Sequence, residues 1–268
     1  MESDSIELLH SIQLDMLVKF DKICEENGLT YFLDSGTALG AVRHHGFIPW
    51  DDDVDVGMPR EDYNRLLELG SNGCLQDNLF LQTYKTDSAY PWPFAKVRLG
   101  DTFFPDFGVE KMKYKGIYID IFPYDKVPSN TKRAVWRIKV SRLFWFISIF
   151  SRRDYPGSNF FSKILTAVLH VMPKGMGVML HRFYERYCIK FNSKDTEVYT
   201  CYSWNMSQYH TYLFEESELF PTKKVSFEGK SLCIVNNPDA YLTKMYGDYL
   251  VLPPEEKRKS HLKGAFVV

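Results

Sequence analysis

A cluster of aspartates early in the chain constrains the possible folds more than any other sequence feature. Four of them fall within five residues: Asp51, Asp52, Asp53 and Asp55. Like charges this close repel one another unless water, basic side chains or a metal ion compensates them. Val54, Val56 and Met58 alternate with the last two aspartates. Because alternate residues of a strand share a face, the pattern predicts a strand over residues 53–58 with both carboxylates on one side.

Three interpretations of the aspartates compete. The first is a solvated acidic turn, although the alternating apolar residues argue against full solvation. The second is a calcium loop that starts at Asp51, but its sixth position is Val56 rather than glycine and its twelfth is Asp62 rather than glutamate. The third is a site for phosphate chemistry, in which paired carboxylates hold Mg²⁺ and align an in-line displacement.

Two further segments favour phosphate chemistry. Asp120 lies between Ile119 and Ile121 in a strand predicted over residues 116–125, which Pro123 is expected to end. A lone strand aspartate is also compatible with a buried, hydrogen-bonded structural role. Upstream, residues 35–37 (Ser-Gly-Thr) occupy a predicted strand-to-helix turn, where backbone N–H groups and the helix dipole favour a phosphate.

The remaining pattern predicts an α+β fold. Helices are expected over residues 4–27, 36–45 and 59–70, and short strands over 29–34, 53–58 and 116–125, with further strands between residues 78 and 104. From about residue 131 the texture changes, because residues 131–153 contain seven basic and no acidic side chains. Helical spacing continues over residues 159–192, which indicates a helical insertion, and short mixed elements return after residue 195.

Composition restricts the class of protein. The chain has 268 residues, 45% hydrophobic and 25% charged, which suits one large domain or a domain with an appendage. Its five cysteines are widely spaced without a CxxC pair, so neither a disulfide framework nor a zinc site is expected. The acidic N-terminus lacks a signal core, and the run at residues 143–150 is too short to cross a bilayer. These features predict a cytoplasmic protein.

Four segments in combination resemble the LicD family: "LDSGTALGAVRHHGFIPWDDDVDVGM", "YPWPFAKVR", "YIDIFPYD" and "YLTKMYGDYLVLPPEEKR". The resemblance covers roughly residues 5–125 and 235–261. It implies a nucleotidyltransferase-like catalytic core over residues 1–130, a helical basic insertion over 131–195, and C-terminal elements over 196–268 that complete the site.

The resemblance also implies an activity. Enzymes of this family use a CDP-activated alcohol, typically CDP-choline, and move the phospho-alcohol group to a sugar hydroxyl of a cell-surface glycan or glycolipid precursor, releasing CMP. Carried over by motif, Asp53, Asp55 and Asp120 would bind Mg²⁺ (or Mn²⁺), and Asp120 would assist deprotonation of the acceptor hydroxyl. Asp51 and Asp52 would orient basic groups or the acceptor.

Substrate contacts are expected from residues within the motifs. The set comprises Ser35, Gly36 and Thr37 for the diphosphate, Arg43 as a phosphate clamp, Lys96 and Arg98 on one strand face, and Lys257, Arg258 and His261 in a tail that folds back over the nucleotide. Surface or salt-bridge roles are the alternatives for these basic residues. A choline head group requires aromatic faces, for which Trp50, Trp92, Tyr118 and Tyr124 are the candidates.

The basic helical region suggests a further partner. Lys132, Arg133, Arg137, Lys139 and Arg142 precede Phe144, Trp145 and Phe146. A basic aromatic segment of this kind suits peripheral contact with an anionic membrane, although a packed helix with a basic solvent face is the first alternative. Nucleic acid is not expected as a partner, because no reader motif accompanies the basic residues.

Other functions remain open from the sequence. A glycosyltransferase also binds a divalent ion and a nucleotide-sugar through D-x-D, but it does not require a third acidic strand residue such as Asp120. A nucleotidyltransferase would leave CMP or AMP on its product. A non-enzymatic metal-binding or membrane-associated scaffold would lose binding or stability, but no turnover, on Asp53→Ala.

Overall fold

The structure, a computed structural model, describes residues 2–105, 111–150, 174–203, 212–258, 260 and 266–267. The helices are α1 (Glu2–Asn27), α2 (Ser35–Arg43), α3 (Arg60–Leu69), α4 (Thr131–Phe150), α6 (Lys174–Cys188), α7 (Glu216–Leu219) and α8 (Pro238–Tyr246), with 3-10 helices η2 (Ile189–Phe191) and η4 (Glu255–Lys257). The strands are β1 (Phe32–Leu33), β2 (Asp55–Pro59), β3 (Leu79–Gln82), β4 (Ala95–Leu99), β5 (Tyr118–Val127), β6 (Val198–Thr200), β7 (Phe214–Glu215), β8 (Lys223–Phe227) and β9 (Lys230–Ile234).

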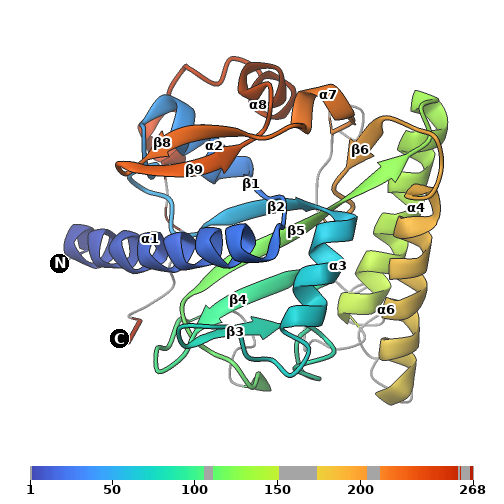
Figure 1. The fold of residues 1–268 in the computed structure, drawn as a ribbon, viewed down its shortest axis with the longest axis horizontal. Helices are drawn as coiled ribbons and strands as arrows, with labels where there is room; N and C mark the ends of the chain where they lie inside the picture. Colours follow the sequence, from blue (N-terminus) through green and yellow to red (C-terminus); the bar gives the residue numbers. More distant parts are fainter. Residues whose placement is uncertain are drawn as a thin grey trace.

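The described strands form a seven-stranded mixed sheet and a separate β8–β9 hairpin. The main order is β1-β2-β5-β4-β3. Strand β6 pairs with the C-terminal end of β5, and β7 pairs with β6. Strand β2 runs parallel to β5, whereas β4 and β6 run antiparallel to it. The helices and this mixed sheet confirm the predicted α+β class (Figure 1). Strand β5 is central, because it pairs with β2, β4 and β6.

The prediction that Pro123 ends its strand is wrong, because β5 continues to Val127. The register explains this continuation. Strand β4 pairs with β5 only as far as Ile121, and β6 begins to pair at Asp125. Pro123 therefore sits between the two antiparallel partners, where its missing N–H group breaks no ladder on that side.

Helix α1 and helix α3 lie across the same face of the sheet, and α4 and α6 lie side by side along one edge of the molecule (Figure 1). Helix α1 buries a stripe at helical spacing that includes Leu9, Met16 and Phe20. The core also holds Val54, Val56 and Met58, all fully buried. The predicted apolar side of the aspartate strand is thus confirmed, but the strand begins at Asp55, and Asp53 lies in the loop before it.

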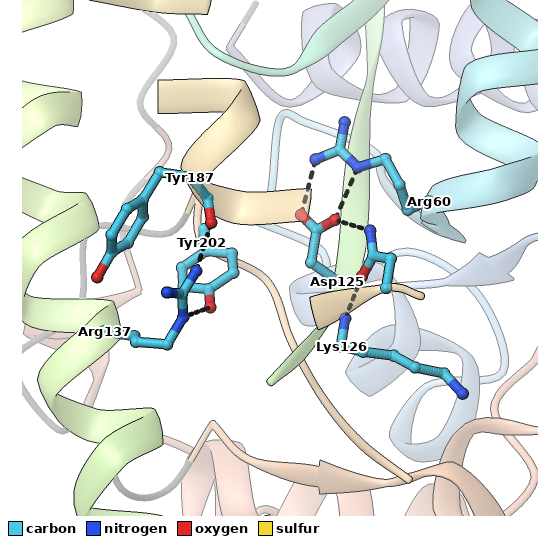
Figure 2. Close-up of polar contacts among 7 residues, drawn as sticks. Arg60, Asp125, Lys126, Arg137, Tyr187 and Tyr202 are labelled. Atoms are coloured by element: carbon cyan, nitrogen blue, oxygen red, sulfur yellow. Dashed lines mark hydrogen bonds and ion pairs between the residues drawn. The ribbon is translucent and has the colours of Figure 1, made fainter. Parts of the chain in front are cut away.

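A buried ion pair joins α3 to β5. The guanidinium of Arg60 donates to both carboxylate oxygens of Asp125, at 2.8 and 2.7 Å. Asn192 also donates to Asp125, at 2.7 Å, and accepts from the backbone N–H of Lys126. Figure 2 shows Arg60 and Asp125 in this arrangement, with Arg137 beside Tyr187 and Tyr202. The ion pair therefore holds α3 against β5, and Asn192 holds the end of η2 against the same strand.

Three sequence predictions concern the chain as a whole. All five cysteines are free, and three of them (Cys24, Cys188 and Cys201) are buried. Within the described residues, we find no helix of the length and apolarity that crossing a bilayer requires. The domain boundaries at residues 130 and 195 remain predictions. Strand β6, after the second boundary, pairs with β5, before the first, so the segments on either side of the helical region share one sheet.

Candidate active site

The site is built where β2, β5 and β4 lie next to one another. In the register, Asp55 of β2 is paired with Asp120 of β5, and Asp120 is paired with Lys96 of β4. Register partners on adjacent strands project to the same face of a sheet. The structure therefore brings Asp55 and Asp120 together from sequence positions far apart.

Lys96 connects Asp120 to an aromatic ring. Its Nζ atom lies 2.6 Å from Oδ1 of Asp120 and 3.3 Å from the ring centroid of Tyr118. The guanidinium carbon of Arg98 lies 4.9 Å from the same centroid. Lys96 is almost fully buried, so this cation is held in the sheet rather than sampling solvent. Tyr118 itself is half-buried and reaches the surface of the site.

Arg98 has mainly structural contacts, although it was predicted to face the diphosphate with Lys96. Its side chain is fully buried. It donates from Nε to Gln82 at 2.5 Å and from Nη1 to the carbonyl of Gly116 at 2.7 Å. Gln82 lies on the edge strand β3 and Gly116 just before β5, and the register pairs Arg98 with Tyr118.

The aspartate loop lies ahead of β2. One carboxylate oxygen from each of Asp51, Asp52 and Asp53 lies within 4.8 Å of the other two. Helix α1 holds this loop from below, because Gln13 donates to the carbonyl of Asp52 at 3.0 Å and His10 bonds the carbonyl of Asp51 at 2.6 Å. From the C-terminal tail, Ser260 donates to the carboxylate of Asp52 at 2.7 Å.

The Ser-Gly-Thr turn begins α2 as predicted. The first α-helical hydrogen bond runs from the N–H of Ala38 to the carbonyl of Asp34, so the N–H groups of Gly36 and Thr37 precede the helical ladder. A Cβ atom on Gly36 would come within 2.7 Å of the Asp51 carboxylate, so only glycine allows this approach. The hydroxyl of Thr37 accepts from the N–H of Asp55 at 2.9 Å, which fixes the turn against β2.

A buried network supports the turn from beneath, and the sequence did not reveal it. Oδ1 of Asp34, the N-cap of α2, accepts hydrogen bonds from the hydroxyls of Tyr124 and Tyr241 and from the N–H of Ser35. Ser35 has a positive φ of 46°, a strained conformation for a residue other than glycine. Tyr124 is therefore part of the support, and the structure does not place it as a face for a choline head group.

The carboxylates repel one another. Burial raises the pKa of Asp55, and the neighbouring charges of Asp53 and Asp120 raise it further. Burial likewise raises the pKa of Asp53, with additional contributions from Asp51 and Asp52, while Lys96 opposes the shift. Burial raises the pKa of Asp34 to about 6 against the hydrogen bonds it accepts. A cation among these groups would relieve the repulsion.

We expect the metal-free protein to lose stability as the pH rises from about 4 to about 7. A carboxyl group with a raised folded-state pKa contributes stability below its unfolded pKa of roughly 4, and that contribution is lost as the pH rises through the folded value. For Asp34, with a pKa of about 6, the loss reaches about 2–3 kcal/mol. Urea denaturation in EDTA measures it, and Asp34→Asn should show a smaller slope. Stability that increases over this interval would contradict the electrostatic account.

The residues present fit a hard divalent cation. All the candidate ligands are carboxylate oxygens, the donors that Mg²⁺ and Mn²⁺ prefer. Asp53 belongs to both groups of carboxylates, since it lies in the oxygen cluster with Asp51 and Asp52 and raises the pKa of Asp55. No sulfur or imidazole ligand has to be invoked.

Basic and aromatic side chains form one rim of the site. The guanidinium of Arg258 lies 5.3 Å from the ring of Trp50, and Arg43 donates to the carbonyl of Tyr249 at 2.9 Å. Burial lowers the pKa of Arg43, with a further contribution from Arg258. The C-terminal tail therefore does return to the aspartate loop. Arg43, predicted as a phosphate clamp, instead binds the backbone of the segment that leads into this tail. Lys257 is exposed, and His261 lies outside the described residues.

The remaining aromatic candidate lies beside the helical region. The ring centroid of Trp92 is 5.9 Å from that of Phe94 and 6.3 Å from that of Trp145 in α4. Lys96 lies 5.8 Å from the ring of Phe94. A row of aromatic side chains thus leads from α4 to the site.

Sequence reasoning missed several supporting residues, and only some left a signal. Gln13 is a polar residue on the buried stripe of α1, which could have marked it. Ser260 and Tyr241 carry no local signal, because their partners, Asp52 and Asp34, lie more than 200 residues earlier.

Comparison with known proteins agrees with this geometry. Residues 28–153, which include all three strand positions of the site, match the protein family described as "LicD/FKTN/FKRP, nucleotidyltransferase domain". The chain is 31% identical over 252 residues to the "Lipopolysaccharide cholinephosphotransferase LicD" of Haemophilus influenzae, and the alignment covers 92% of each protein.

More distant similarity reaches animal proteins. The mouse and human proteins named "Ribitol 5-phosphate transferase FKRP" are each 45% identical to the chain over 47 residues. This match covers 18% of the chain and 10% of each of those proteins.

Proposed function

The chain belongs to the LicD family of phosphotransferases, and on that premise we propose that it transfers a phospho-alcohol group, most simply phosphocholine, from a CDP-activated donor to a sugar hydroxyl. The cholinephosphotransferase relative aligns with nearly the whole chain, whereas the ribitol phosphate transferases align with a short segment. That difference favours choline over an alditol as the head group.

One observation carries the proposal: Asp55 and Asp120 are register partners on parallel strands, with Asp53 two residues before Asp55. A third acidic position on a neighbouring strand is what phosphoryl or nucleotidyl transfer requires and what a D-x-D glycosyltransferase does not. The turn at Gly36 and Thr37 supplies the other requirement, a set of backbone N–H groups beside the carboxylates.

Asp53, Asp55 and Asp120 would hold the divalent cation. When bound, such a cation neutralises phosphate charge and aligns an in-line displacement. The N–H groups of Gly36 and Thr37 bind the donor diphosphate, and Lys96 stabilises negative charge on it from the sheet side. The rim arginine Arg258 faces the nucleotide from the tail.

The reaction balances as follows. The acceptor hydroxyl oxygen forms a bond to the phosphorus that bears the alcohol, and the bond from that phosphorus to the bridging oxygen of CMP breaks. The bonding electrons leave with CMP, and the proton of the acceptor hydroxyl passes to a site carboxylate. We assign this proton to Asp120, whose Lys96 partner fixes its orientation.

The test is incubation with Mg²⁺ and a panel of CDP-alcohols, with and without sugar acceptors, while CMP release is followed. We expect acceptor-dependent CMP release with CDP-choline and none after removal of the metal by EDTA. Hydrolysis of nucleotide-sugars without CMP release from any CDP-alcohol would instead indicate a glycosyltransferase. A product that retains CMP would indicate nucleotidyl transfer.

Substitutions of two basic residues on the same face of β4 should separate effects on catalysis from effects on folding. We expect Lys96→Met to lower kcat/KM by about 10²–10³-fold, because one group that stabilises developing charge is lost. Arg98→Met should instead lower the free energy of unfolding by about 1–3 kcal/mol, because Gln82 and the carbonyl of Gly116 lose their buried donor. Steady-state kinetics and urea denaturation of both variants measure the two effects. Equal loss of activity at unchanged stability in both would contradict the separation.

A further inference from the structure

Helices α4 and α6 form an antiparallel pair. Arg137 donates to the carbonyl of Tyr187, while Phe144, two turns further along α4, packs against Phe183 with ring centroids 4.9 Å apart. Each helix buries one stripe against the rest of the protein. Among the described residues, the buried ones are Ala134, Arg137, Ile138, Ser141 and Trp145 on α4, and His181, Tyr184 and Cys188 on α6.

The opposite stripes are unusually apolar for solvent-facing surface. The exposed fraction is 62% for Trp136 and 58% for Leu143 on α4, and 60% for Met179 and 51% for Phe183 on α6. Helical spacing places these residues opposite the buried stripes of their helices. Both helices therefore present large apolar side chains away from the core.

Basic residues are interleaved with the apolar ones. Together they form a surface that we call the hairpin face: Lys132, Trp136, Lys139 and Leu143 from α4, and Met179, Arg182, Phe183 and Arg186 from α6. Within α4 and α6 there are eight lysine and arginine residues and a single acidic residue, Glu185. Glu185 is half-buried and accepts a hydrogen bond from Tyr84 at 2.7 Å. The hairpin face thus carries one sign of charge.

We propose that the hairpin face docks on a lipid bilayer that contains anionic phospholipids. An ordinary solvent-facing helix mixes charges of both signs and exposes few large apolar side chains. A basic face with tryptophan, phenylalanine and leucine suits the headgroup boundary, where aromatic rings insert and lysine and arginine pair with lipid phosphates. The charge complementarity selects an anionic membrane over a neutral one. This inference does not depend on the identity of the donor.

Flotation of the full chain with lipid vesicles tests the proposal. We expect binding to vesicles of phosphatidylethanolamine and phosphatidylglycerol, release at high salt, and little binding to pure phosphatidylcholine. Lys132→Glu with Arg182→Glu should lower the partition coefficient at least about tenfold, because each basic residue contributes several-fold to binding. Trp136→Ser with Leu143→Ser should lower it about tenfold as well.

Matched variants on other faces serve as controls. Lys223→Glu with Lys230→Glu changes the same number of exposed charges on the β8–β9 hairpin, and Leu8→Ser with Leu69→Ser removes exposed leucines from α1 and α3. Both controls should bind like the unaltered protein, and thermal unfolding confirms that each variant is folded.

Four results would overturn the proposal. The first is equal binding to neutral and anionic vesicles. The second is a loss of binding in the control variants as large as in the variants of the hairpin face on α4 and α6. The third is a stable dimer in solution that Trp136→Ser with Leu143→Ser dissociates, since a second copy would then be the occupant of this face. The fourth is an unaltered protein that binds neither kind of vesicle.

Discussion

Asp55→Asn is expected to lower kcat/KM for phospho-alcohol transfer by about 10³-fold or more. Asp55 lies at the centre of the site, with Asp120 as its register partner and Asp53 two residues earlier. An amide keeps the shape of the side chain but removes the negative charge that a divalent cation requires, and the cation contributes several kcal/mol to the transition state. CMP release with CDP-choline and an acceptor measures the effect.

The same variant should behave differently in a folding experiment. Because burial and the charges of Asp53 and Asp120 raise the pKa of Asp55, its ionised form destabilises the metal-free protein near neutral pH. We therefore expect Asp55→Asn to have a higher Tm than the unaltered protein in EDTA, and a smaller increase in Tm on addition of Mg²⁺. Asp15→Asn, which changes an exposed carboxylate on α1, should alter neither activity nor the Mg²⁺ response. Full activity in Asp55→Asn would refute the proposed chemistry.

Arg60→Met is expected to lower the free energy of unfolding by about 3–5 kcal/mol. The substitution leaves the carboxylate of Asp125, which is fully buried, without its counter-charge. Asn192 alone cannot neutralise that carboxylate, although it remains as a hydrogen-bond donor. Urea denaturation at neutral pH measures the loss, and Arg60→Met with Asp125→Asn should recover part of it because no unpaired charge remains.

An exposed ion pair provides the comparison. Lys22 lies 3.8 Å from Glu26 on the solvent side of α1, and both side chains are largely exposed. Lys22→Met should change the free energy of unfolding by less than about 1 kcal/mol. If Arg60→Met were as mild as Lys22→Met, the Arg60–Asp125 pair would not hold α3 against β5 as described.

The local parts of the fold could be predicted because short-range patterns determine them. Alternation of valine and aspartate specified the strand and its buried side, and the Ser-Gly-Thr turn specified the start of α2. Gly70 marked the end of α3, where it is the C-cap residue. The strand through Pro123 could not be predicted, because the tolerance of proline there depends on where two other strands stop pairing.

The candidate site was predictable in its residues and not in its connections. Asp120 could be singled out as a charge within an apolar strand, but its register with Asp55 and its ion pair with Lys96 depend on how three strands align. Arg98 shares a strand face with Lys96, yet its partners on β3 and before β5 make it a structural residue. Periodicity shows which residues share a face, whereas tertiary contacts determine what lies opposite them.

The hydrogen bonds of α8 to the turn before α2 have a consequence for protein synthesis. Tyr241 contacts Ser35, which precedes it by 206 residues. A nascent chain on the ribosome therefore exposes the turn and its strained serine long before the tyrosine that supports them has been made. Catalytic competence should appear only after α8 has left the ribosome, and chains truncated before Tyr241 should be inactive.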